Sequence, residues 1–364
     1  MSAASGTTIK SNPTEAWLLE AARRGASDLH LIGGYPPVLR LHGRLEDLSE
    51  ATVPDEQVRS WLMELLPAHL QERFVAERNA DFAIELELDG QPQRFRANYF
   101  VAADSTGACF RVIPDTIPDF HWAGFPRDLA DRLANFRNGL VLFSGITGSG
   151  KTTTLAMIIN LLCQRGGYRV VTIEEPIEYR YPRTSGSIVT QREVGRDVGS
   201  FNEGLKYALR QDPDVNLVGE IRDRETAQTA LSAAETGHLV FATLHTSDAK
   251  GAISRYADLF PQDAQPEVRS QLSNSLRAVI SQHLLPSILP DDKRVLAVEV
   301  LINNSPIAIA IRAGRMETID NTILTSRADG MITLNESIKR HYQAGRISRE
   351  TAEHFVSDAS FLKM

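Results

Sequence analysis

The stretch from Gly145 to Thr152 has the residue types and the spacing that hold the phosphates of a nucleotide. It reads Gly-Ile-Thr-Gly-Ser-Gly-Lys-Thr, and glycines let backbone N–H groups approach phosphate oxygens without steric clash. Lys151 adds a positive charge for the β- and γ-phosphates, and the hydroxyl of Thr152 suits Mg²⁺. The expected cofactors are therefore ATP and Mg²⁺. The residues expected to bind the nucleotide are Gly145, Thr147, Gly148, Ser149, Gly150, Lys151, Thr152 and Thr153.

Three further apolar runs each end in acidic or histidine side chains. Together with the run before the glycine-rich loop, they alternate with helical patterns, which predicts a mostly parallel, doubly wound α/β sheet. The carboxyl ends of such strands share one edge, where ligands bind. The side chains expected there are Glu174 and Glu175 after 169–173, Glu220 after 215–218, and His245 after 239–244.

Hydrolysis of a bound triphosphate needs a group that activates the attacking water and ligands for the metal ion. Glu174, Glu175 and Glu220 are candidates for both tasks, because carboxylates accept protons and bind Mg²⁺ directly or through water. His245 is a candidate donor to the γ-phosphate. Each carboxylate taken alone is equally consistent with a helix cap or an ion pair.

The region before the ATP-binding motif contains an alternating strand with a cationic face. A period of two puts Arg94 and Arg96 on one face, and Arg111 joins that face if its own strand lies alongside. Two interpretations stay open, namely ion pairs with nearby carboxylates or contact with phosphates. If the arginines serve a nucleotide held by a neighbouring subunit, the protein is an oligomer.

Composition limits the domain organisation and the partners. The chain has 364 residues, of which 42% are apolar and 23% charged, and a net charge of −7. This acidic balance argues against nucleic acid as a partner. Two cysteines without CxxC spacing predict no zinc and fit a reducing cytoplasm. The expected domains are an α+β unit at 1–113 with a helical stretch at about 54–78, a linker at 114–124, and an ATPase domain at 125–364. The part beyond 248 is expected to be mainly helical, with one strand at 295–301.

Four sequence blocks resemble the secretion ATPases of type II and type IV systems, most closely the branch that retracts type IV pili. Two shorter matches lie nearer the N-terminus. The blocks are the loop Gly145 to Thr152, then 172–178, 217–223 and 237–246, and the shorter matches are 26–31 and 94–98.

The resemblance implies a homohexamer of PAS-like N-terminal and RecA-like C-terminal domains that moves an inner-membrane pilus or secretion platform protein. The chain would be cytoplasmic and reach the inner membrane through partners. The implied roles are general base for Glu174, Mg²⁺ contact for Thr152, Glu175 and Glu220, a nucleotide-binding histidine box for His238 and His245, and nucleotide contacts for Arg94, Arg96 and Arg111.

One block departs from the retraction branch. Retraction ATPases resemble one another in a late Ala-Ile-Arg-Asn-Leu-Ile-Arg-Glu block, and this chain has Pro306 to Ala313 there, with alanines at Ala308 and Ala313. The functional alternatives are a short type IV secretion ATPase and an accessory retraction motor. Two further alternatives are a RecA-like nucleic-acid translocase and a nucleotide-binding scaffold without turnover.

Overall fold

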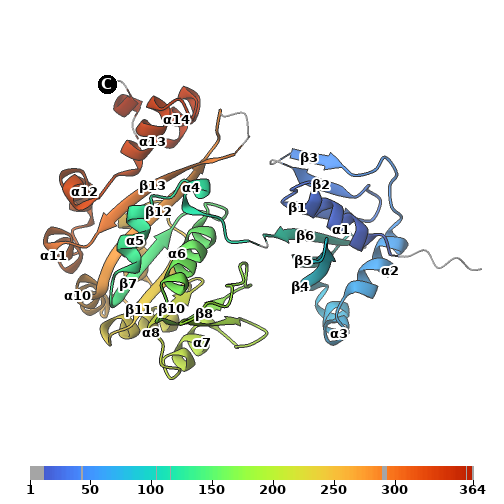
Figure 1. Cartoon of the computed structure of the whole chain (residues 1–364), viewed down its shortest axis with the longest axis horizontal. Helices are drawn as coiled ribbons and strands as arrows, with labels where there is room; N and C mark the ends of the chain where they lie inside the picture. Colours follow the sequence, from blue (N-terminus) through green and yellow to red (C-terminus); the bar gives the residue numbers. More distant parts are fainter. Residues whose placement is uncertain are drawn as a thin grey trace, which may run out of the picture. The chain divides into compact units, whose positions relative to one another are not determined.

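The computed structural model describes residues 12–41, 44–103, 105–114, 116–288, 293–357 and 359–362. The chain divides into two compact units, Met1–Asp115 and Thr116–Met364 (Figure 1). No helix within these described ranges is long and apolar enough to span a bilayer.

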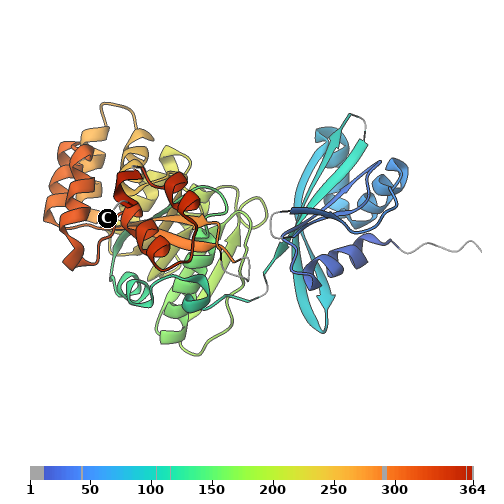
Figure 2. The same cartoon turned by 90° about the horizontal axis from the view of Figure 1, so that it is seen from above.

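The first unit is an antiparallel sheet covered by helices on one face. Its strand order is β3-β2-β1-β6-β5-β4, and Figure 2 shows the blue helices on one side of the strands. The strands are β1 (Asp28–Ile32), β2 (Val38–Leu41), β3 (Arg44–Asp47), β4 (Asn79–Leu88), β5 (Gln91–Ala102) and β6 (Ser105–Ile113), and the helices are α1 (Thr14–Arg23), α2 (Asp55–Leu65) and α3 (Ala68–Glu77).

Alternation along β5 divides this sheet into an apolar and a polar face. Phe95, Ala97 and Tyr99 are fully buried on the helix-covered face. On the polar face, Arg96 lies opposite Arg111 across the β5–β6 pair, as the period of two predicts. The helical stretch expected at 54–78 forms two helices, since α2 ends before a proline and α3 begins after it.

The second unit is built on a seven-stranded sheet in the order β13-β12-β7-β11-β10-β8-β9. All neighbours are parallel except the antiparallel pair β12–β13. The strands are β7 (Gly139–Ser144), β8 (Arg169–Glu174), β9 (Ile188–Glu193), β10 (Val215–Val218), β11 (Leu239–Leu244), β12 (Leu276–Leu285) and β13 (Val295–Ile302).

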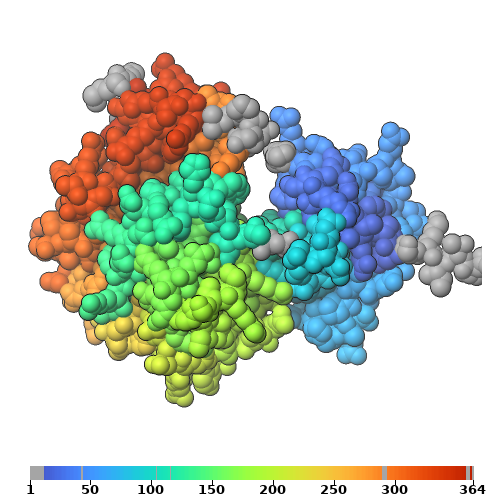
Figure 3. Space-filling view, in the orientation of Figure 1, coloured from blue at the N-terminus to red at the C-terminus, as the bar shows by residue number. Residues whose placement is uncertain are grey.

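Helices cover both faces of this sheet, with the green α6 on one side and the yellow α8 and α9 on the other (Figure 2). Residues coloured orange to red, which include α11 to α14, form one edge of the unit's surface (Figure 3). The helices are α4 (Phe120–Ala123), α5 (Arg127–Ala134), α6 (Lys151–Arg165), α7 (Phe201–Ala208), α8 (Arg224–Glu235), α9 (Ala249–Asp258), α10 (Gln265–Ser275), α11 (Ser305–Ala313), α12 (Ile319–Thr325), α13 (Leu334–Gln343) and α14 (Arg349–Phe355), with single 3-10 turns η1 (Met316–Thr318), η2 (Arg327–Asp329) and η3 (Ala359–Leu362).

The core of the second unit follows from strands that are apolar on both faces, as parallel sheets require. Every residue of β7, β10 and β11 is buried. Two features differ from the sequence expectations. Strands β9 and β12 were not expected, and α4 forms within the residues expected as linker, where Phe120 packs against Phe125 of the second unit.

Candidate active site

The glycine-rich loop lies between β7 and α6, at the carboxyl edge of the parallel strands. Gly145, Gly148 and Gly150 have φ values of 142°, 78° and 91°, a region that side chains disfavour. Gly145 is also crowded, because a Cβ there would lie within 3.0 Å of the Ser149 hydroxyl and the Gln282 carbonyl. The glycines thus permit a tight loop that turns directly into a helix.

Lys151 and Ser149 are buried polar groups within this loop. The Lys151 Nζ donates to the carbonyls of Gly145 at 2.6 Å and Ile146 at 3.1 Å. Burial lowers the pKa of Lys151, while the charges of Glu220 and Glu178 oppose that shift. The Ser149 hydroxyl is buried and has no hydrogen-bond partner among the described residues. A buried ammonium and an unsatisfied hydroxyl fit a phosphate ligand.

Strand β12 supports the loop from the side, through residues that sequence reasoning missed. It runs parallel to β7 with Ser281 opposite Ser144, and their hydroxyls hydrogen-bond in the core. One residue further, Gln282 donates to the hydroxyl of Thr154 on α6 at 2.8 Å. The strand before the glycine-rich loop and the helix after it are therefore both held by β12.

Glu220 is held between two neighbouring strands. The N–H of Gly219 donates to the Ile173 carbonyl of β8 at 2.7 Å, and the Gly219 carbonyl accepts from the Thr243 hydroxyl of β11. A side chain at 219 would crowd the Ile173 carbonyl at 3.1 Å. The glycine before Glu220 therefore allows the close strand approach that fixes this carboxylate.

Arg222 joins two of the expected acidic residues, and sequence reasoning gave it no role. Its two terminal nitrogens lie 2.8 Å from the Glu175 carboxylate and 2.7 Å from the Glu220 carboxylate. His245 Nε2 lies 3.2 Å from the other Glu220 oxygen. Burial acts to raise the pKa of Glu220, but Arg222 and His245 outweigh it and leave the pKa below its ordinary value. Glu220 is therefore ionised at neutral pH.

Glu174 lies on the same edge but faces different partners. Only 5% of its surface is exposed. Its carboxylate accepts from the Thr172 hydroxyl at 2.6 Å and from the Gln191 amide at 3.1 Å. Since β11 and β10 separate β7 from β8, Glu174 lies three strand spacings, about 14 Å, from the strand that carries the glycine-rich loop.

Thr152 and Thr153 open α6, and both are partly buried. The Thr153 hydroxyl lies 3.0 Å from the hydroxyl of Tyr179. Thr147 is exposed on the loop itself. The loop residues, Lys151 and Glu220 are thus brought to one edge of the sheet.

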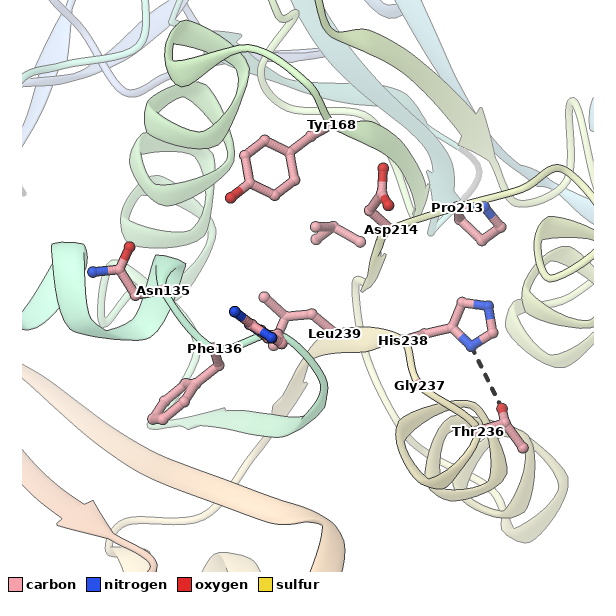
Figure 4. Close-up of a pocket in the computed structure, with 11 residues that line it drawn as sticks. Asn135, Phe136, Tyr168, Pro213, Asp214, Thr236, Gly237, His238 and Leu239 are labelled. Carbon is pink, nitrogen blue, oxygen red and sulfur yellow. Dashed lines mark hydrogen bonds between the residues drawn. The ribbon is translucent and has the colours of Figure 1, made fainter.

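His238 lies away from this group, and its expected contact with a nucleotide stays a prediction. It precedes β11, whereas His245 follows it, so a six-residue strand of about 20 Å separates them. His238 lines a hollow of about 310 Å³ at the amino edge of the sheet with Tyr168 and Asp214 (Figure 4). Its Nδ1 lies 3.2 Å from the Ala233 carbonyl.

The expected arginines lie on the polar face of the first unit's sheet. Arg111 pairs with Asp28 at 3.0 Å, and Arg96 lies 3.7 Å from Asp81. Arg94 is 8% exposed. The ion-pair interpretation therefore describes Arg96 and Arg111 in this structure.

The oxygen donors at the carboxyl edge fit a hard cation. A hydroxyl from Thr152 and a carboxylate from Glu220 are the ligand types that Mg²⁺ prefers, with phosphate oxygens and water completing its shell. Glu175, at 38% side-chain exposure, is available to water. Within the described ranges, no three His, Cys, Asp or Glu side chains form a metal cluster on their own.

A parallel sheet with a glycine-rich loop opening a helix and acidic residues on adjacent strand ends defines a phosphate-loop ATPase. The particular assignment follows from comparison with known proteins. The model of the Type II/IV secretion system protein family matches residues 4–362. The chain therefore belongs to this family.

Individual relatives agree with this assignment. The chain is 40% identical over 332 residues to the type IV pilus retraction ATPase PilT of Pseudomonas aeruginosa, covering 91% of this chain and 94% of the relative. It is 39% identical to the uncharacterised YggR of Escherichia coli, at 90% and 97% coverage. A crystal structure of the pilus retraction motor PilT with bound ADP matches with a TM-score of 0.85 at 39% identity, over 98% of this chain and 99% of that one. The expected fold, an N-terminal α+β domain followed by a RecA-like ATPase domain, is confirmed.

Proposed function

We propose that this protein is the motor ATPase of a type IV pilus system and that its ATP turnover drives pilus retraction. The observation that supports this most directly is the full-length match to the ADP-bound PilT structure, together with the glycine-rich loop and Lys151 at the carboxyl edge of the sheet. The proposed machine is a homohexamer in the cytoplasm, peripheral to the inner membrane, acting on a platform protein there.

Within the site, we propose that Lys151 and the loop amides bind the β- and γ-phosphates, and that Thr152 and Glu220 bind Mg²⁺, with Glu175 next to them. Mg²⁺ would neutralise charge on the phosphates. Glu174, whose carboxylate accepts hydrogen bonds from Thr172 and Gln191, is proposed as the general base, and His245 as the donor near the γ-phosphate.

The first unit carries three arginines that suit the γ-phosphate. In the second unit, Arg222 lies at this edge but is paired with Glu175 and Glu220, and the charge that develops on the γ-phosphate in the transition state needs a cation. We propose that Arg94, Arg96 and Arg111 supply it in the assembled oligomer, which requires Arg96 and Arg111 to exchange their present carboxylate partners for phosphate.

The test uses Lys151→Ala in the source cell, with Lys206→Ala, an exposed lysine on α7, as the matched control. We expect Lys151→Ala to abolish ATPase activity in the purified protein while leaving the fold intact. Cells carrying it should show excess pili that do not retract, and the control should match wild type.

Other outcomes contradict the proposal in different ways. Unchanged ATPase activity in Lys151→Ala would remove the loop from catalysis. Bald cells would place the motor on the assembly side, and loss of a secreted product with normal pili would make the chain a secretion ATPase. The departure at Pro306 to Ala313, which forms α11 with Ile309 at 62% exposure, makes this distinction worth measuring.

A further inference from the structure

Glu299 on β13 is a buried carboxylate outside the site described above. It is 6% exposed, and it accepts two backbone hydrogen bonds, from the N–H of Ala249 at 2.7 Å and from the N–H of Leu334 at 3.3 Å. Ala249 is the first residue of α9 and Leu334 the first residue of α13. One carboxylate therefore caps two ten-residue helices, where unpaired N–H groups and the helix dipoles favour negative charge.

The first of these helices, α9, starts shortly after His245, the histidine that contacts Glu220. Only 246–248 separate His245 from Ala249. Glu299 therefore binds the N–H of Ala249, the residue at which the chain that leaves the active site enters a helix. Asp248 caps the same helix with its own side chain, accepting from the N–H of Gly251 at 2.6 Å.

The second helix, α13, is one of the C-terminal helices α12 to α14. Residues 247–250, which join His245 to α9, make further contacts with these helices. His283 Nε2 donates to the Ser247 carbonyl at 2.8 Å, and its ring lies edge-on to Phe355 of α14 with centroids 6.5 Å apart. Lys250 pairs with Asp320 of α12 at 2.6 Å. Residues 247–250 thus contact α12 directly, and reach α13 and α14 through Glu299 and His283.

We propose that Glu299 is a positioning residue that holds the segment after His245 and links it to α13, so that the C-terminal helices set how His245 faces Glu220. This inference rests on the proposed role of His245 in ATP turnover. A buried carboxylate that accepts backbone N–H groups from two elements fixes both, because loss of either bond leaves a buried donor unsatisfied.

The experiment compares Glu299→Gln with wild type in the full chain. Glutamine keeps the size of the side chain but has one acceptor oxygen, so one of the two helix N–H groups loses its partner. We expect kcat for ATP hydrolysis to fall at least fivefold while the affinity for ADP changes less than twofold. Hydrogen exchange in a peptide spanning 247–251 should become faster.

The matched control is Thr333→Ala. Thr333 caps α13 through the N–H of Glu336 at 3.3 Å, so this variant weakens the same helix start without freeing Ala249. It should keep kcat within twofold of wild type. Glu299→Ala serves as a second variant that removes both bonds, and if it fails to fold, Glu299→Gln decides.

Three results would overturn the inference: kcat within twofold of wild type in Glu299→Gln, an equal loss of kcat and ADP affinity, or a loss of kcat without faster exchange at 247–251. His245→Ala separates this from the proposed function. If His245→Ala lowers kcat and Glu299→Gln does not, only the positioning role fails. If His245→Ala leaves kcat unchanged, the proposed role of His245 itself fails.

Discussion

Replacing Arg222 by alanine should destabilise the second unit measurably in the absence of nucleotide. The contact to Glu220, whose side chain is 16% exposed, is a charge-assisted hydrogen bond worth about 1 kcal/mol once the partial exposure of the arginine is allowed for. The contact to the more exposed Glu175 is worth about 0.5 kcal/mol. The sum of about 1.5 kcal/mol lowers the melting temperature of a domain of this size by about 3–6 °C.

Two further variants test whether the two ion pairs of Arg222 cause this loss of stability. Arg222→Lys should lower the melting temperature by roughly half as much as Arg222→Ala, because a single ammonium cannot hold two carboxylates as the guanidinium does. Arg224→Ala is the control, since Arg224 is an exposed residue of the same chain segment without an ion pair within the described part of the chain. Its melting temperature should stay within about 1 °C of wild type, as expected for a surface substitution.

The pH dependence provides a second criterion for the same interaction. Because the pKa of Glu220 is lowered from 4.5 in the folded protein, its stabilising contribution is complete above pH 4.5 and declines as the pH falls through the lowered folded value. Calorimetry at pH 7.5 and at decreasing pH below 4.5 should show the difference between wild type and Arg222→Ala shrinking in acid. A difference that stays constant with pH, or a melting temperature within 1 °C of wild type at pH 7.5, would refute this account.

Two other predictions test the glycine-rich loop and the nucleotide-binding role of His238. Gly145→Ala should cost about 2–4 kcal/mol in unfolding free energy because its Cβ meets backbone as well as a side chain. Gly148→Ala, with a positive φ and nothing within 4 Å, should cost only about 1 kcal/mol by denaturant titration, and equal costs would contradict the steric argument. His238→Ala should leave ADP affinity within twofold of wild type by fluorescence titration, since the residue lies at the opposite sheet edge; a tenfold loss would show that this edge also serves the nucleotide.

Much of the site was predictable because its residues lie in short motifs or at the ends of apolar strands. The loop at 145–152 specifies its own conformation, and polar residues at the ends of apolar strands must meet at one edge once the sheet is parallel. This placed Glu174, Glu220 and His245 correctly on that edge. His238 precedes the strand that His245 follows and therefore lies at the opposite edge. Its nucleotide-binding role, which only the family resemblance implies, stays a prediction.

The missed parts depend on tertiary pairing. Strand β12 directly follows α10, and its polar Ser281, Gln282 and His283 interrupt the apolar run, so its local pattern does not distinguish strand from helix. Pairing with β7 decides the outcome. The contact of Arg222 with Glu175 could not be predicted either, because the two residues are 47 positions apart in sequence and meet only in the folded sheet.

The division of the chain into two units, each with its own buried core, changes how its unfolding is read. A chain of two domains need not unfold in one cooperative step, so a single melting temperature does not describe the stability of the whole molecule. A calorimetric scan of this protein is expected to contain two transitions, and substitutions at Arg222 or Gly145 should shift only the transition of residues 116–364. The transition of the first unit then serves as an internal reference within each sample.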